Sequence, residues 1–410
     1  MVYPEGRSRP AVLHTSPGPE LLARRPQVLD TSDAMRIVRL PGRTTTCWLV
    51  SVLAAALTAR AVDAQVQPLP RRGVRPALQQ STVPGESGWQ LEPNATVDLW
   101  YHGLAVIGVT QQGILPLYSA AYASKVREEK ERLGIYPTKL DELGEEISQA
   151  IESDGALSLL HFAPLYFHAA DPLEMLRALS AVADRRAGDV AVANPRVRFG
   201  AIVMTQMLQT AGQRRVVGRL VAAMEDEYAV FFRGFRERQR AEYRDRLADL
   251  ERRWTDGLAL DLADFLGRMG LESGVLIPSP ALGPEGRLFQ GDPLGGQTRL
   301  IAVWMPLDGG VDAPLYGAVR ELGFSLVDRV VDPERYDPSE LENVRAGAAV
   351  RFGAMLLEFY APAQLSGYRR AFVEAAGSPL TGRATAAAFE QAYPLDPDVV
   401  SLLRREIRRR

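Results

Sequence analysis

The sequence predicts an α+β, predominantly α-helical protein, with a helical N-terminal half and a small antiparallel sheet packed with a helix in the C-terminal half. A long run of helix-forming residues with charges of alternating sign extends from Gly218 to about Leu266. Short β-prone runs separated by Gly and Pro follow it, and no repeat at solenoid periods is visible. With 46% hydrophobic and 24% charged residues, the chain has the composition of a globular protein with a sizeable core.

The first element is predicted to be a secretory signal peptide at residues 35–64. Arginines precede an apolar core from Cys47 to Ala59, and Val62 and Ala64 occupy the −3 and −1 positions of a small-residue cleavage site. The core is shorter than the roughly 20 apolar residues that cross a bilayer, so we expect no membrane span in the mature chain. We therefore expect export to the periplasm or medium, cleavage after Ala64, and a start at Met35, with residues 1–34 untranslated or disordered.

The composition of the mature chain narrows its chemistry further. Cys47 is the only cysteine and lies inside the predicted signal, which leaves no disulfide, thiolate nucleophile or cysteine-bound metal. The net charge of −2 gives none of the basic excess that nucleic-acid binding requires. We expect no nucleic-acid partner and no cofactor.

The helical region is predicted at residues 93–268, after a Pro- and Gln-rich flexible leader at 65–92. The apolar run from Val97 to Val109 favours a strand, with a helix as the alternative. Cap residues mark two of the helices, because Thr138 has Asp141 three residues on and Asp171 precedes a proline. The expected helices cover 118–133, 138–152, a segment from 172, and the long charged run, in which Glu225, Asp226 and Glu227 are predicted to lie on a solvated face.

The C-terminal region, 269–410, begins with three β-prone runs, "SGVLIPSPAL", "GRLFQGD" and "TRLIAVWMPL". A helix over 313–331 follows the last run, with Asp312 as its cap and Pro314 in its first turn. Ser339 is predicted to cap a long helix that ends near Pro362. The tail predicts a helix, a turn and a final basic helix.

The helix over 313–331 contains "VRELGFSLVD", which resembles the zincin motif H-E-x-x-H of metallopeptidases. In that family two histidines at i and i+4 share a helix face and bind zinc, and the glutamate between them activates the metal-bound water. Here Glu321 stands at the glutamate position, and Arg320 and Phe324 replace the histidines. The resemblance covers roughly residues 297–332, and a strand running into the helix is its usual setting. It implies a zincin-like region in the C-terminal half.

The departures from the motif argue against peptidase activity. Arg320 is a permanent cation that repels zinc, and Phe324 offers no ligand. Glu358 on the next helix is a candidate for a third, glutamate ligand, but one carboxylate does not hold catalytic zinc alone. The resemblance therefore implies a pseudoenzyme with Glu321 as a vestige, whereas an ordinary amphipathic helix explains the same residues without descent from a peptidase.

Three function hypotheses follow from the sequence. The first is an exported, inactive metallopeptidase-like protein with a binding or regulatory role, whose partner is an extended peptide or protein added as a strand along "TRLIAVWMPL". The second is a structural or scaffolding periplasmic protein. The third is an active metallohydrolase whose metal is bound by His102, His161 and His168, although buried structural histidines explain these residues better. Exposure of Glu321 separates the first two, because a vestigial site faces a cleft and a chance helix leaves it in solvent.

Overall fold

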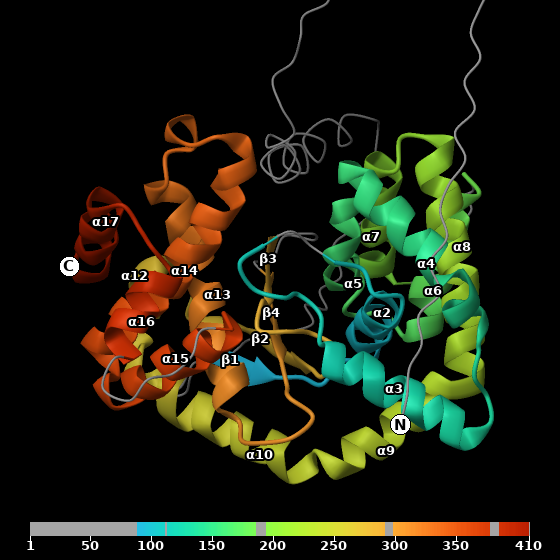
Figure 1. Ribbon diagram of the computed structural model, residues 1–410, viewed down its shortest axis with the longest axis horizontal. Helices are drawn as coiled ribbons and strands as arrows, with labels where there is room; N and C mark the ends of the chain where they lie inside the picture. The colour runs from blue at the N-terminus through green and yellow to red at the C-terminus, as the bar shows by residue number, and fades with distance from the viewer. Residues whose placement is uncertain (1–87, 111–112, 186–193, 292–297, 378–384, 410) are drawn as a thin grey trace, which may run out of the picture. The chain divides into compact units, whose positions relative to one another are not determined.

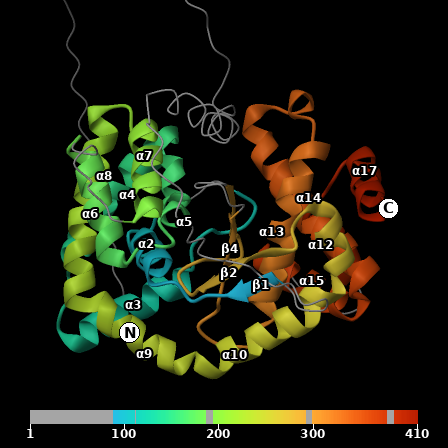
Figure 2. The same ribbon diagram turned by 180° about the vertical axis from the view of Figure 1, so that it is seen from behind.

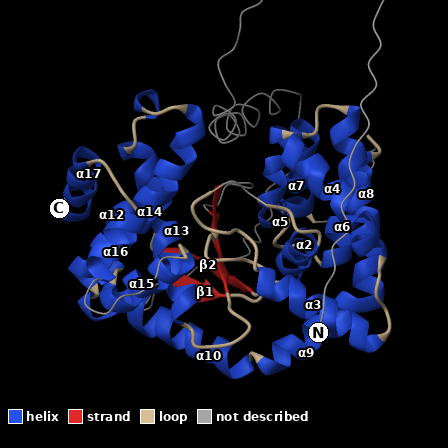
Figure 3. Ribbon diagram, in the orientation of Figure 1, coloured by secondary structure: helices blue, strands red, loops and turns tan. Residues whose placement is uncertain are grey.

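The computed structural model describes residues 88–409 except 111–112, 186–193, 292–297 and 378–384. The predicted signal peptide at 35–64 and the segment 1–34 lie outside the described residues. Helices predominate in the described part, and a single small sheet accompanies them (Figure 3). The predicted fold class, α+β and predominantly helical, is confirmed.

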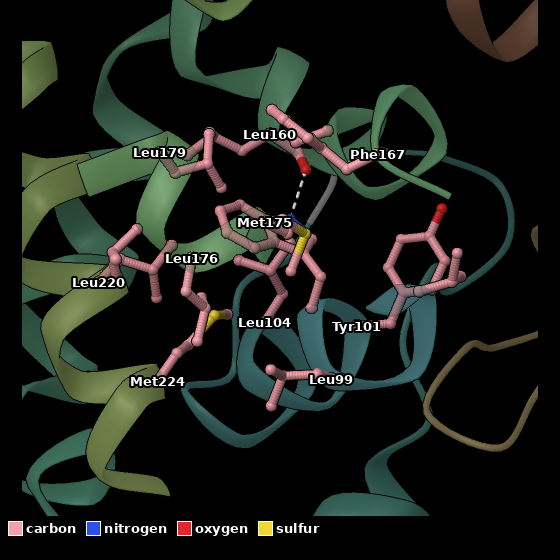
Figure 4. Close-up of a cluster of buried hydrophobic side chains, with 14 of the residues drawn as sticks. Leu99, Tyr101, Leu104, Leu160, Phe167, Met175, Leu176, Leu179, Leu220 and Met224 are labelled. Carbon is pink, nitrogen blue, oxygen red and sulfur yellow. Dashed lines mark hydrogen bonds between the residues drawn. The ribbon is translucent and has the colours of Figure 1, made fainter. Parts of the chain in front are cut away.

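The N-terminal helices pack around one hydrophobic core. Figure 4 shows leucine and methionine side chains of three helices and a 3-10 turn converging there, with Tyr101 on the side of its helix away from Leu220 and Met224. The indole of Trp100 ties the core to the 3-10 turn by donating to the carbonyl of Leu160 over 2.7 Å. The elements are α2 (Ala95–Val106), α3 (Ala120–Leu133), α4 (Lys139–Ser153), η2 (Gly155–His161), α5 (Ala163–Tyr166), α6 (Pro172–Ala183), α7 (Pro195–Met207) and α8 (Ala211–Glu227).

Helix α2 replaces the strand expected at Val97–Val109. Asn94 caps it, because its side-chain oxygen accepts hydrogen bonds from the backbone N–H groups of Thr96 and Val97. The helix is buried on nearly every side, so its sequence is apolar all round and carries no 3.6-residue stripe. A short apolar run of this kind does not distinguish a strand from a buried helix.

A long, nearly continuous helix then connects the two halves of the chain, as Figures 1 and 2 show from opposite sides. Two π-helical turns interrupt it, and bulky aromatic side chains such as Phe231, Phe232 and Trp254 are buried there. Together with α8 its segments are η4 (Tyr228–Phe232), α9 (Arg233–Glu242), α10 (Arg244–Arg253), η5 (Trp254–Leu258), α11 (Ala259–Asp261) and α12 (Ala263–Met269).

The sheet has the strand order β1-β2-β4-β3, formed by β1 (Gly88–Leu91), β2 (Ser273–Ser279), β3 (Arg287–Gly291) and β4 (Thr298–Trp304). The pairs β1–β2 and β2–β4 are parallel, and only β3–β4 is antiparallel. The expected antiparallel sheet is therefore mixed. Strand β1 precedes the whole helical half, within the stretch predicted as leader, and this long connection permits its parallel pairing.

The sheet separates two hydrophobic cores. Along β4, Leu300 and Ala302 belong to the N-terminal core, whereas Ile301 and Val303 belong to the C-terminal core. Successive side chains point to opposite faces of a strand, and helices cover both faces, so the strand is apolar without alternation. Both cores therefore use residues from either side of the predicted boundary at 268/269.

The C-terminal helices cover the second face of the sheet. Helix α13 matches the predicted 313–331 helix to within a residue at each end. Helix α15, which begins at Pro362, was not predicted. No helix among the described residues combines the length and apolar character that a bilayer crossing requires. The elements are α13 (Asp312–Val330), η6 (Pro333–Arg335), α14 (Pro338–Tyr360), α15 (Pro362–Ala375), α16 (Thr385–Ala392) and α17 (Pro397–Arg408).

Candidate functional site

The zincin-like positions lie on α13, directly after β4, in the expected strand–turn–helix order. Arg320 is fully buried, and its guanidinium forms an ion pair with the carboxylate of Glu321. The same guanidinium lies over the ring of Phe324, with Cζ 4.8 Å from the ring centroid. Arg320 thus contacts both the retained glutamate and Phe324, the second substituted position.

Glu321 is only 2% exposed and packs against the connection between β2 and β3. A Cβ atom at Gly286 would come within 3.0 Å of Glu321 Cγ and 2.6 Å of the carbonyl oxygen of Ala302, so only glycine fits. Burial raises the pKa of Glu321, and the positive charges of Arg320 and Arg287 oppose this shift. The carboxyl group is therefore enclosed by protein and does not face open solvent.

Glu358, the candidate third ligand, is exposed on α14. Gly323 of α13 meets Phe352 of α14, where an added Cβ would lie 2.7 Å from the Phe352 ring. Glu358 lies on a different side of α14 from Phe352, which is fully buried. The structure does not bring Glu358 to the buried carboxyl of Glu321.

A second group of buried charges lies between the sheet and the N-terminal helices. Arg287 of β3 donates to Glu285 over 2.6 Å, and its guanidinium lies 5.1 Å from the ring centroid of Phe162. Nearby, the hydroxyl of Tyr118 and Nδ1 of His161 share a hydrogen bond of 2.7 Å. Burial lowers the pKa of His161 to about 3, with a further contribution from the charge of Arg287. His161 is therefore neutral at physiological pH.

The three histidines do not converge on a metal site. His102 lies inside the helical bundle, His161 pairs with Tyr118, and Nδ1 of His168 lies 3.1 Å from the carbonyl oxygen of Leu165. Across the described ranges no group of three histidine, aspartate or glutamate side chains is arranged to hold a metal ion.

His102 instead belongs to a buried polar network centred on Glu227, whose predicted solvated position is wrong. The Tyr122 hydroxyl donates to His102 Nδ1, and His102 Nε2 donates to Glu227 Oε1, both over 2.9 Å. Lys130 donates to Glu227 Oε2 over 2.9 Å and to Asp141 over 2.8 Å. These bonds place the proton of a neutral His102 on Nε2.

Electrostatics in this network stabilise an ionised glutamate beside a neutral histidine. Burial alone would raise the pKa of Glu227, but hydrogen bonding to His102 and the charge of Lys130 outweigh it and lower the pKa to about 2. Burial lowers the pKa of His102, against the influence of Glu227. The Thr138 hydroxyl completes the glutamate's environment by donating to Oε2 over 2.5 Å.

Two features of the sequence point to this network: the rarity of lysine and a predicted helix cap. Lys130 is one of only three lysines, and the predicted capping pair of Thr138 and Asp141 supplies two of its partners. The capping box is confirmed, since the backbone N–H of Thr138 donates to Asp141 over 2.8 Å. The location of Glu227 inside the bundle follows only from how α8 packs on α4.

Comparison with known proteins adds no relationship to this geometry. No family model, no curated protein and no solved structure matches the chain. The fold and the site therefore define only a class: a predominantly helical α+β protein with buried ion pairs on both faces of a small mixed sheet.

Proposed function

We propose that the chain is an exported, catalytically inactive metallopeptidase-like protein that binds an extended peptide. The main observation in its favour is the cation beside Glu321. A zincin places a metal ion next to this glutamate, whereas here the guanidinium of Arg320 lies there and the ring of Phe324 covers it. Export is inferred from the signal-like pattern at residues 35–64.

The strand that was predicted to receive the peptide is not available for it. Strand β4 lies inside the sheet, paired with β2 on one side and β3 on the other. Strand β3 is at the edge, and among the described residues its backbone hydrogen bonds go to β4 alone. An edge strand has one row of unpaired backbone groups, which an extended peptide can satisfy. Glu321 lies next to the start of this strand through its contact with Gly286.

The structural or scaffolding alternative rests on the burial of α13. Its apolar residues, including Val319, Leu322 and Leu326, belong to the C-terminal core, which explains the helix without any ligand. The enclosure of Glu321 matches neither the open cleft expected of a vestigial site nor the solvent exposure expected of a chance helix. Experiments on the motif and on the strand edge separate the two functions.

The first experiment restores both histidines with the double variant Arg320→His/Phe324→His. The two imidazoles would share one face of α13 beside Glu321, so in equilibrium dialysis we expect the double variant to bind more zinc than the wild type, although more weakly than a zincin because Glu358 supplies no third ligand. The wild type and the single variants Arg320→His and Phe324→His serve as controls, and we expect them to retain no zinc. A folded double variant that binds no more zinc than the controls would contradict the zincin-like geometry.

The same zinc measurement tests the metallohydrolase alternative. Zinc retained by the wild type and lost on replacing His102, His161 or His168 by alanine would favour that hypothesis over the present proposal.

The second experiment tests peptide binding directly. Wild-type protein, residues 65–410, is used to select from a phage-displayed library of random octapeptides, and a selected peptide is synthesised with and without N-methyl groups on alternate backbone nitrogens. Strand addition depends on main-chain hydrogen bonds, so we expect N-methylation on the paired side to abolish binding. Equal affinity for the methylated peptide, or no selected peptide, would count against β3 as a binding edge.

A further inference from the structure

A small cavity lies where α9 passes between the N-terminal helices and the ends of β2 and β4. Its volume is about 30 Å³, enough for roughly two water molecules. Apolar side chains, among them Phe232, Leu247 and Met305, form part of its wall. The zincin-like positions do not line it, so the cavity is separate from the site proposed above.

Two buried hydrogen-bond donors in this cavity have no protein partner. Gln239 is 5% exposed and Tyr243 is 7% exposed, and neither Nε2 of Gln239 nor the hydroxyl of Tyr243 has a hydrogen-bond partner among the described residues. Leaving a buried polar group unpaired costs free energy, so such groups indicate a missing water or ligand. Both side chains come from consecutive turns of the long helix and line the same cavity.

The charges around the cavity sum to one positive charge. The carboxylate of Asp98 is neutralised by Arg236, whose Nε donates to Oδ2 over 2.9 Å. Its other oxygen, Oδ1, has no hydrogen-bond partner among the described residues, and burial raises the pKa of Asp98 against the charge of Arg236. Arg240 also lines the cavity; it is exposed and forms no ion pair within the described part of the chain. Arg240 therefore accounts for the net positive charge around the cavity.

We propose that this cavity is a binding site for the carboxylate group of a small organic acid. The amide of Gln239 and the hydroxyl of Tyr243 would donate to its oxygens, and Arg240 would supply the counter-charge at the opening. Charge-assisted hydrogen bonds of this kind are stronger than neutral ones. The small volume admits a planar carboxylate with a short apolar tail and excludes a larger anion.

The test is calorimetric titration of the wild-type protein with sodium formate, acetate and propionate at constant ionic strength set by sodium chloride. We expect a binding isotherm for the short carboxylates and none for citrate, which is larger. Tyr243→Phe removes only the unpaired hydroxyl and should weaken binding about fivefold, whereas Arg240→Ala should weaken it about tenfold. Arg233→Ala is the matched control on the same helix, because Arg233 is exposed and does not line the cavity.

The variants distinguish a ligand site from a water-filled cavity. The hydroxyl of Tyr243 makes no hydrogen bond within the protein, so removing it breaks no contact of the fold. Tyr243→Phe should therefore keep the wild-type melting temperature but bind the carboxylate more weakly. The proposal is overturned if no short carboxylate binds, if Tyr243→Phe and Arg240→Ala bind as the wild type does, or if citrate binds equally well. None of these outcomes depends on zinc or on peptide binding at β3.

Discussion

The carboxylate of Glu227 accepts hydrogen bonds from three side chains at the centre of the helical bundle, those of His102, Lys130 and Thr138, so its charge should be important for stability. The variant Glu227→Gln preserves the shape but leaves the buried ammonium of Lys130 with only Asp141 as a counter-charge. Breaking a buried ion pair is strongly destabilising, and we expect a loss of about 3 kcal/mol in the free energy of unfolding. Urea denaturation at pH 7 measures it.

Glu225 provides the matched control for this substitution, because it is exposed two residues earlier on the same helix. Glu225→Gln should change the free energy of unfolding by less than about 0.5 kcal/mol. Equal effects of the two substitutions would show that the buried network contributes little to stability.

His161 should make the stability pH-dependent through a single buried group. Its folded-state pKa of about 3 lies below the ordinary value of 6.5, so the unfolded chain binds the proton first as the pH falls. Stability from a neutral His161 is therefore complete above pH 6.5 and is lost progressively as the pH falls towards 3.

The variant His161→Asn retains an acceptor for Tyr118 but does not titrate. Between pH 7.5 and pH 5, the wild type should lose about 2 kcal/mol more unfolding free energy than His161→Asn. Urea denaturation of both proteins across this range checks the difference. Between pH 7.5 and pH 8.5 the gap between them should remain constant, and a gap that is constant down to pH 5 would contradict the buried, neutral state.

At the scale of elements, the cap of α2 is unusually well connected. The side-chain oxygen of Asn94 accepts from two backbone N–H groups, and its amide nitrogen donates to the carbonyl of His168 over 2.7 Å. Asn94→Ala should therefore cost about 2 kcal/mol of unfolding free energy, at the upper end for a cap.

Ser119→Ala removes the simpler cap of α3, where the hydroxyl accepts one hydrogen bond from the backbone of Tyr122. We expect a cost of about 1 kcal/mol, measured by the same denaturation series. A smaller loss for Asn94→Ala than for Ser119→Ala would mean that the link from α2 to His168 adds nothing.

The helices and strands also show which parts of the fold could be predicted from the sequence. Caps such as Thr138 and Asp171 are local signals, so the helices that they begin were predicted correctly. Strand β1 depends on pairing with β2 residues nearly 200 positions away, and the interior position of β4 depends on which strands pair with its two edges; one sequence carries no signal for either. Buried polar contacts could not be predicted for the same reason. Glu227 looks like its exposed neighbour Glu225 until α8 packs against α4.

At the scale of the whole molecule, the sheet joins two cores that neither half of the chain completes alone. The N-terminal core includes Ile277 and Leu300 from the sheet, and the C-terminal core includes Trp89 and Leu115 from the N-terminal half of the chain. A cut near residue 271 would expose apolar surface on both fragments and remove the pairing of β1 with β2.

Residues 88–409 should therefore unfold in one cooperative transition, and the fragments 88–271 and 272–409 should each lack one. Near-UV circular dichroism and thermal unfolding of each fragment, alone and mixed, test this expectation. Mixing should restore a native-like transition only if the cores re-form across the sheet. A fragment that unfolds cooperatively by itself would instead establish independent domains at the 268/269 boundary, and the shared cores would then be an interface between them.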